Sequence, residues 1–509
     1  MRRARWIAGG ALALALALPL PSGAAAARSL PAPPPPGDLS APSLQRYQEA
    51  LLAAWGGDHR TVPLEVKARH FEWMLWRYHR TPWKQILPRV DLGDAPGDPV
   101  TFLPGADVST WNGALLSALS HRYAATRDPA TLERIAWLLE GLHRFQEVTG
   151  VRGLAARCVL ASETPLRKLT RTWIGPDGTR YHWRPDPAKG TYNQLVMGYA
   201  ALAVHAYADL PPEARRRARL DLEALTSHVV RGGFRIRDAA GNPTRYGNLR
   251  PRVLGLAIPF NAQVAWLMVA AGRHLPTEDP AARAQVEEAH ARLDADHPYW
   301  RSPRRHWLVR PQRVGDSVFI DGNDRNHLMG AAFTALALEL DAAAREGRPA
   351  DRARVHRLGR TLYWTARRLP EHRYSLANFM WAATIRDPER LAAIVPDPGD
   401  RARVRREAAV LLDQGVEQLR RFPLDRFIWE GTEGRSGGPY WMDEYRPDSY
   451  AWKIEPDRHW IVTGPPTHHM RAAIDFLHAY WLMRHTGLDR TPSIAAKHGR
   501  VLARSRQPF

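Results

Sequence analysis

The chain has 509 residues, a formal net charge of +20 and one cysteine, Cys158. This length suits one large domain or two ordinary ones, and a single cysteine excludes an internal disulfide, so packing must stabilise the fold. The charge comes mostly from arginine, and a basic surface attracts anions. We expect an anionic glycan or lipid surface rather than nucleic acid as the partner; a solvated arginine-rich face without a specific partner is the alternative reading.

The first residues predict export. Met1 to Arg5 are basic, residues 6–20 are apolar, and small residues between Ser22 and Arg28 offer a cleavage site. This order is typical of a secretory signal peptide over residues 1–27, whose apolar stretch is too short to span a bilayer comfortably. No cysteine follows it, which argues against lipid anchoring. We therefore expect a secreted or periplasmic protein.

Three further regions follow the signal peptide. Residues 28–42 are rich in proline and predict an extended linker, because proline cannot continue a helix. Residues 43–489 are the expected folded domain, and residues 490–509 a basic tail. No later segment has the uninterrupted apolar length of a membrane helix, since residues 254–272 are broken by Pro259 and polar residues.

Helical periodicity dominates the domain. Two helices are predicted at residues 44–55 and 64–78, and an apolar helix then alternates with an arginine-rich amphipathic one. The apolar helices are predicted at residues 109–126, 194–207, 260–271, 328–340, 376–385 and 470–485. Their amphipathic partners are predicted from Asp128-Pro129 to Gly150 and at residues 211–230, 280–293, 352–369 and 401–421.

This alternation predicts an all-α fold. A helix that is apolar all round is buried and an amphipathic one lies outside it, so about six helical hairpins can close into an (α/α) toroid. Short β-hairpins are expected at residues 172–183 and 234–247. Polar residues open the apolar helices and would gather at one mouth of the ring. These openers are Asp107-Val-Ser-Thr-Trp-Asn, Tyr192-Asn-Gln, Asn261-Ala-Gln, Asn323-Asp-Arg-Asn-His, Asn378 and Thr467-His-His.

Several segments resemble a family. They are Trp111-x-Gly113, the runs 121–128 and 148–157, and the runs 238–247 and 480–487. Over residues 107–489 the chain resembles largely uncharacterised secreted bacterial helical-toroid proteins related to six-hairpin glycosidases. The resemblance implies a toroid that acts on glycans. Where such relatives carry acids at the openings of the first two inner helices, this chain has Val108 and Asn193-Gln194, and amides cannot shuttle protons at neutral pH.

Carboxylates near the expected mouth suggest glycoside hydrolysis, which usually uses two of them. The catalytic candidates are Asp321, Asp324 and Glu430, with His327 as a further acid or base. Each has a plainer interpretation. Asp324 can be a helix cap, Glu430 a solvated loop acid, and His327 an interior histidine.

A polysaccharide lyase is the second enzymatic reading. It needs a tyrosine or histidine base, with arginine or asparagine to neutralise a uronate carboxylate. Aromatic faces could also stack on sugar rings, although core packing is the commoner role of a tryptophan. The candidate substrate-binding residues are Trp111, Asn112, Arg157, Tyr192, Asn193, Arg245, Tyr246, Trp429, Tyr440 and His468.

Known metal and cofactor motifs are absent from the sequence. There is no His-Glu-x-x-His, no paired cysteines and no glycine-rich nucleotide loop, so neither a metal nor a cofactor is predicted. We expect a secreted carbohydrate-active enzyme, a hydrolase or a lyase, that cleaves a polysaccharide or oligosaccharide. The alternative is a non-catalytic glycan-binding or cell-envelope protein on a degenerate toroid.

Overall fold

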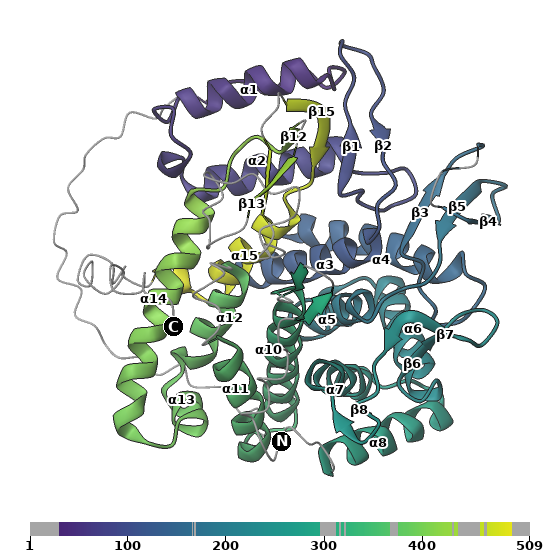
Figure 1. The fold of residues 1–509 in the computed structure, drawn as a ribbon, viewed down its shortest axis with the longest axis vertical. Helices are drawn as coiled ribbons and strands as arrows, with labels where there is room; N and C mark the ends of the chain where they lie inside the picture. The colour runs from purple at the N-terminus through teal and green to yellow at the C-terminus, as the bar shows by residue number, and fades with distance from the viewer. Residues whose placement is uncertain are drawn as a thin grey trace.

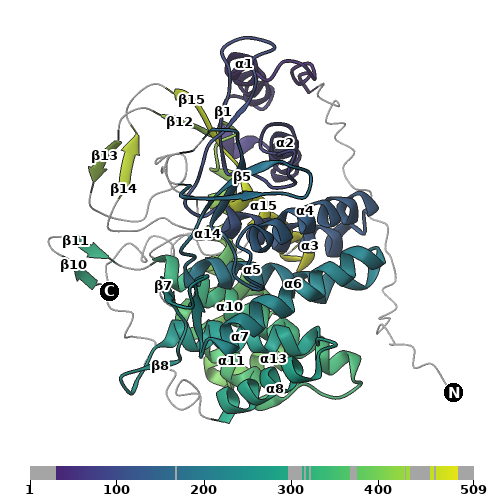
Figure 2. The same ribbon diagram turned by 90° about the vertical axis from the view of Figure 1, so that its right-hand side faces the viewer.

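The computed structural model describes residues 30–164, 166, 169–295, 312–314, 317–319, 322–366, 375–429, 432–435, 459–462 and 466–490. These residues form two layers of helices with strands gathered on one side (Figures 1 and 2). One continuous apolar cluster, from Ala41 to Leu488, fills the space between the helices.

Six helices of the described chain form an inner ring. Each contacts the next in chain order, and the last contacts the first. They are α3 (Val108–Thr126), α5 (Lys189–His205), α7 (Pro259–His274), α10 (Gly322–Arg345), α12 (Ser375–Arg386) and α15 (Ile474–His485). The ring is therefore closed, and the fold is the all-α toroid that the sequence predicts. Contact between α10 and α5 also crosses the ring, so its interior is packed.

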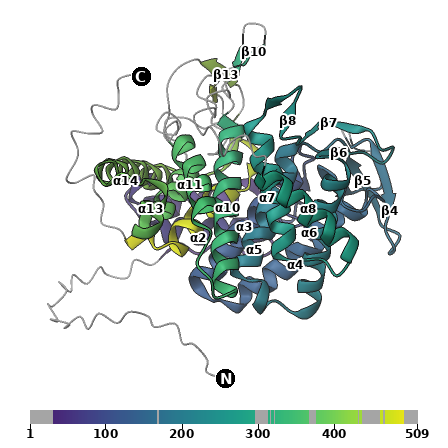
Figure 3. The same ribbon diagram turned by 90° about the horizontal axis from the view of Figure 1, so that it is seen from below.

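An outer layer pairs with this ring (Figure 3). The outer helices are α4 (Pro129–Glu147), α6 (Pro212–Arg231), α8 (Pro280–Ala295), α11 (Arg352–Ala366) and α14 (Pro398–Arg420). Each contacts the inner helix that precedes it in the chain. The last inner helix, α15, instead contacts α2 (Leu64–Tyr78), which lies near the start of the chain. The sixth hairpin is thus built from two helices at opposite ends of the described sequence.

Two glycines set the closest contact in the ring, between α3 and α5. A Cβ atom on Gly113 would lie 2.7 Å from the carbonyl oxygen of Gln194. On the facing helix, a Cβ atom on Gly198 would lie 2.5 Å from the carbonyl oxygen of Gly113. Both distances are shorter than a carbon can approach an oxygen, so the two backbones touch where any side chain would hold them apart.

Aspartates begin several outer helices. The Asp128 carboxylate accepts a hydrogen bond from the Ala130 backbone N–H at 3.0 Å, as its position before Pro129 predicts. Asp397 caps α14 in the same way. Asp387 caps a short helix, α13 (Pro388–Ile394), that the sequence did not predict. Seven residues carry too little periodicity to show as a separate helix.

The strands lie on the side of the ring where the inner helices begin (Figures 2 and 3). Each group precedes an inner helix in the chain, so it must lie at that helix's N-terminal end. The strands are β1 (Arg89–Asp91), β2 (Thr101–Phe102), β3 (Cys158–Ala161), β4 (Arg171–Ile174), β5 (Arg180–Arg184), β6 (Arg235–Arg237), β7 (Pro243–Asn248), β8 (Arg252–Val253), β9 (Leu256–Ala257), β10 (Gln312–Val314), β11 (Ser317–Phe319), β12 (Phe427–Trp429), β13 (Thr432–Arg435), β14 (His459–Val462) and β15 (Pro466–Arg471).

Two of these strand groups differ from the sequence prediction. The hairpin β4–β5 gains a third strand, β3, to give the order β3-β5-β4. Met470 was predicted to open the last inner helix, but it lies on β15, paired with Val90 and Phe427 in the sheet β12-β15-β1-β2. An apolar residue just before a helix fits either assignment, and long-range pairing with β1 decides it.

The chain ends are only partly described. The predicted signal peptide over residues 1–27 and most of the predicted tail over 490–509 lie outside the described residues. The segment from Leu30 is non-helical, and α1 (Ala41–Ala53) begins three residues before the predicted start, with Pro42 in its first turn. Within the described residues, no helix combines the length and apolar character needed to cross a membrane.

A buried lysine joins α2 to the C-terminal end of α14. Lys67 on α2 is fully buried, and its ammonium donates to the carbonyl oxygens of Leu419 (3.3 Å), Arg420 and Phe422 (2.6 Å). These carbonyls lie at the C-terminal end of α14, where the helix dipole favours a positive charge. The rings of Phe71, Phe422 and Phe476 pack together beside it, with centroids 4.8 to 5.4 Å apart. The cluster holds α2, the end of α14 and α15 together.

We expect Lys67→Met to lower the free energy of unfolding by about 2–4 kcal/mol, because it leaves buried carbonyls without their charged donor. The matched control is Arg69→Met on the same helix. The Arg69 side chain is 67% exposed, and its ion pair with Glu65 spans 3.7 Å, so its loss should cost less than about 0.5 kcal/mol. Urea denaturation measures both, and equal costs would contradict a role of Lys67 in closure.

Candidate functional site at the N-terminal ends of the inner helices

Two predicted site residues meet between α5 and α10. Asn193 is fully buried and His327 is 3% exposed. The Asn193 Nδ2 donates to the backbone carbonyl of His327 at 3.1 Å and lies 3.1 Å from its Nδ1. Because an amide nitrogen only donates, Nδ1 of His327 accepts, and the imidazole carries its proton on Nε2. The contact fixes both the position and the tautomer of this histidine.

Gly190, three residues before Asn193, leaves room for the imidazole of His327. A Cβ atom on Gly190 would lie 2.9 Å from Nε2 of His327. The side chain of His327 therefore lies over the first turn of α5, and Phe260 from α7 packs edge-on against it at 6.0 Å. The ammonium of Lys189 in turn lies 4.3 Å from the Phe260 ring. Three inner helices thus contribute to the surroundings of His327.

An ion pair lies at the start of α3. Nη2 of Arg157 lies 2.6 Å from Oδ1 of Asp107, and its Nε donates to the Ala106 carbonyl at 2.8 Å. Asp107 stands at the N-cap position but makes no cap hydrogen bond with its side chain. Asp107 and Arg157 are therefore tied to each other, and the pair fastens the segment before β3 to the first inner helix.

Three other predicted residues are buried in the wall of the ring. Trp111 is 3% exposed, and the amide of Asn112 exchanges hydrogen bonds of 2.9 Å with the backbone of Ile86 while donating to Val108 at 2.8 Å. The Tyr192 hydroxyl donates to the Gly153 carbonyl at 2.6 Å, and burial raises the pKa of this phenol far above its ordinary value. Their polar groups hold loops against the ring.

The predicted residues on the strands are exposed. Tyr246 is 48% exposed, and the Arg245 guanidinium lies 5.1 Å from its ring. The backbone N–H of Arg245 donates to the Asp186 carboxylate at 2.7 Å, which ties strand β7 to the segment entering α5. On β15, Nδ1 of His468 lies 2.9 Å from Asp94. Tyr246 is the described residue of this set best placed to stack on a sugar.

Buried amides accompany these residues. Gln194, Asn261 and Gln263 are at most 4% exposed, and each has at least one side-chain polar atom without a hydrogen-bond partner among the described residues. In Gln263 this holds for both amide atoms. Buried polar groups without a protein partner usually bind water or a ligand. Amides near the N-terminal ends of α5 and α7 thus remain able to hydrogen-bond.

Most of the predicted carboxylates lie outside the described residues. Asp321, Glu430 and Tyr440 are among the residues that the structure does not describe. For Trp429, at the end of β12, only the backbone is described. The backbone of Asp324 belongs to the first turn of α10, one helical turn before His327. Their roles stay predictions.

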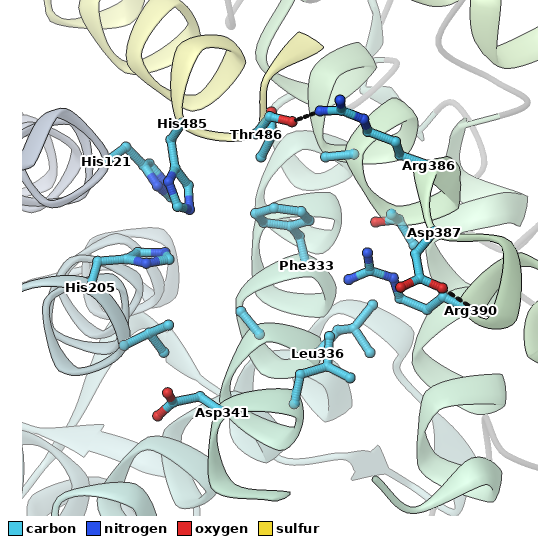
Figure 4. Close-up of a pocket in the computed structure, with 15 residues that line it drawn as sticks. His121, His205, Phe333, Leu336, Asp341, Arg386, Asp387, Arg390, His485 and Thr486 are labelled. Atoms are coloured by element: carbon cyan, nitrogen blue, oxygen red, sulfur yellow. Dashed lines mark hydrogen bonds between the residues drawn. The ribbon is translucent and has the colours of Figure 1, made fainter. Parts of the chain in front are cut away.

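A second group of polar residues was not predicted. A cavity of about 520 Å³ lies at the opposite end of the ring, between the C-terminal halves of the inner helices (Figure 4). His121, His205 and His485 line it from α3, α5 and α15. The only sequence signal was a histidine in or near the last turns of several predicted inner helices, which points to one shared site only once the ring is known.

Comparison with known proteins does not identify a family. No protein-family model matches the chain, and no curated protein matches it. A solved structure of a GH76 alpha-mannanase from Bacteroides thetaiotaomicron aligns with 84% of this chain and 96% of its own, at 10% identity and a TM-score of 0.37. At that TM-score and identity, the likeness establishes neither a family nor a substrate for this chain.

We expect Asn193→Ala to lower the free energy of unfolding by about 1–3 kcal/mol, because two acceptors of the buried His327 lose their donor. Gly190→Ala should displace the same imidazole and have an effect of similar size. Asn242→Ala, in an exposed turn of the β6–β7 hairpin, is the control and should cost less than about 0.5 kcal/mol. Urea denaturation compares the three; a neutral Asn193→Ala would show that the contact is incidental.

Proposed function

We propose that the protein is a secreted carbohydrate-active enzyme that cleaves a polysaccharide or oligosaccharide at the N-terminal ends of its inner helices. The observation that supports this is the closure of the ring. It gathers openers from distant parts of the chain, including Asp107, Asn193 and His327, beside strands with an exposed aromatic residue, Tyr246. Glycan sites combine polar hydrogen-bonding groups with aromatic faces in this manner.

Hydrolysis is one form of this activity. It would use two carboxyl groups, and Asp324 is the candidate whose backbone lies nearest the described cluster, in the turn before His327. Asp321 and Glu430 are the candidates for the second. The separation of the two groups would decide between retention and inversion at the anomeric carbon, because an inverting enzyme must fit a water molecule between the sugar and its base.

Elimination is the other form, and it fits an acidic glycan. With its proton on Nε2 and Nδ1 accepting from Asn193, His327 would donate a proton to the leaving oxygen rather than abstract one. An exposed tyrosine or histidine, such as Tyr246 or His468, would then be the base, and an arginine would neutralise the uronate. Of the two predicted arginines, Arg157 is 12% exposed and paired with Asp107, whereas Arg245 is exposed on β7. Arg245 is therefore the arginine better placed to meet a carboxylate.

A glycan-binding protein without catalysis is the second candidate. The observation that favours it is chemical: the buried openers of α5 and α7 are amides, and Asp107 is already paired with Arg157. Amides can hold sugar hydroxyls by donating and accepting hydrogen bonds, but they transfer no proton.

A panel of neutral and acidic glycans tests the proposal on the purified mature protein. Reducing ends and the ultraviolet absorbance of unsaturated uronates are followed together. Reducing ends alone indicate a hydrolase, and both signals indicate a lyase. If neither signal rises on a broad panel while glycans still bind, the enzymatic proposal is wrong and the binding protein replaces it.

If hydrolysis is found, we expect Asp324→Ala and Glu430→Ala each to lower kcat by at least about 100-fold, the usual contribution of a positioned acid or base. Glu133→Ala is the control, since Glu133 is exposed on the outer helix α4. Circular dichroism confirms folding before kcat is compared. Wild-type turnover in both folded variants would show that the catalytic residues lie elsewhere.

A further inference from the structure

The end of the ring opposite the strands carries a cavity of its own. It is lined from six helices, by the C-terminal halves of α3, α5, α10 and α12, the start of α13 and the end of α15. Its walls are chemically unlike one another (Figure 4). Histidines line one side, Arg386 and Arg390 line the other, and Phe333 lies between them.

Three histidines converge on the first wall. His121 comes from α3, His205 is the last residue of α5, and His485 is the last residue of α15. One ring nitrogen from each lies within 4.8 Å of the other two. The ring centroids are 4.4 Å apart for His205 and His485 and 5.1 Å apart for His121 and His205. In Figure 4 the rings of His121 and His485 overlap, and the ring of His205 lies next to them.

The histidines have few partners of their own. His121 is 5% exposed, and within the described residues its Nδ1 has no hydrogen bond, although a buried imidazole nitrogen usually has one. Burial lowers the pKa of His205 to about 3 and lowers the pKa values of His121 and His485 as well. The rings are therefore neutral near pH 7, the form in which imidazole binds a metal ion.

We propose that His121, His205 and His485 bind a zinc ion whose fourth coordination position opens into the cavity. Three protein ligands with an open position are the usual pattern of a zinc site that binds water or another ligand. Around a tetrahedral zinc, nitrogen atoms at about 2.0–2.1 Å from the metal lie about 3.4 Å from one another. Small side-chain rotations close the present separation of up to 4.8 Å.

The nitrogen donors favour zinc over harder cations. Magnesium and calcium prefer oxygen ligands, and the only carboxylates lining the described cavity are Asp341 and Asp387. Imidazole also suits copper and nickel, but three neutral histidines with one open position match the usual ligand set of a zinc site that binds water. Two of the three ligands end their helices, where the helix dipole also favours a cation.

Neighbouring charges shape the site further. Asp341 on α10 lies beside the histidines, but it pairs with Arg345 and with His274 at 2.8 Å. Arg127, just past α3, opposes a cation and is itself paired with Asp209 at 3.4 Å. Across the cavity, Arg386 donates to the Thr486 carbonyl, and Nε of Arg390 has no partner among the described residues. A small anion on the zinc would face these two arginines.

His478 provides a matched control in the same cluster. Its ring stacks on His121 with centroids 5.9 Å apart, and it is 3% exposed, but it is outside the group of three nitrogens. If the cluster were only a packed stack of aromatic rings, replacing His478 would perturb the protein as much as replacing its neighbours. If the cluster binds zinc, replacing His205 or His485 should weaken metal binding far more than replacing His478.

Cobalt titration tests this on the whole protein, freed of metal by a chelator and carrying no polyhistidine tag. We expect one equivalent of Co²⁺ to bind with the intense visible bands of four-coordinate cobalt, and Zn²⁺ to abolish them. His205→Gln and His485→Gln should weaken binding at least about 100-fold, more than the loss of an outer-shell partner costs. His478→Gln should bind as wild type does.

Chemical footprinting of the wild-type protein tests the same site without depending on the folding of any variant. Zn²⁺ should protect His205 and His485 from diethyl pyrocarbonate, and leave His143 on the outer layer, whose side chain is 46% exposed, reactive. Lack of stoichiometric binding, wild-type affinity in folded His205→Gln, or no protection would each overturn the proposal. None of these readouts uses a glycan, so the metal site and the proposed function can fail separately.

Discussion

The packing of α15 between α3 and α2 is the contact on which the structure depends. It joins the last inner helix to the first and supplies α15 with an outer partner from the start of the described chain. Phe71 on α2 packs against Phe476 on α15 at this junction, and Lys67 joins α2 to the end of α14 beside it. Without it, the helices would form an open arc, and apolar helices such as α3 would expose a face to water. With it, each end of the ring is surrounded by helices on all sides.

The two ends differ in chemistry because the inner helices run in the same direction. At their N-terminal ends, backbone N–H groups and amide side chains face the strands, so this end suits hydroxyl-rich or anionic ligands. At their C-terminal ends, backbone carbonyls accompany imidazoles, so this end suits a cation. Asn193 with His327 represents the first environment, and His205 with His485 the second. One topology thus provides two sites of opposite preference.

Much of the helical framework could be predicted from the sequence because it depends on local patterns. Asp128-Pro129 begins α4 where a capping aspartate predicts it, and the apolar stretches become the inner ring. The prediction was wrong where a long-range partner decides the structure. Met470 pairs with Val90 on a strand, and β3 joins a hairpin that lies after it in the chain.

In the candidate sites, too, local sequence patterns predict which residues take part, and tertiary contacts decide what those residues do. Asn193 and His327 were predicted from their position before inner helices, but their contact depends on the packing of α5 against α10. Tyr192 was predicted from the same opener, but its hydroxyl is used by the backbone of a loop, which no periodicity reveals. The three histidines come from three helices far apart in the chain. Because no short spacing connects them, a search for metal motifs cannot find them.

The origin of the sixth hairpin has a consequence for how the chain acquires its structure. Pairs such as α3 with α4 join neighbours in sequence, so they can form early at a small cost in chain entropy. The pair of α2 with α15 encloses nearly the whole domain, so it brings together the most distant segments of the described chain. We therefore expect ring closure to be a late, non-local step, and the histidine cluster, to which α15 contributes His485, to be completed near the end of folding.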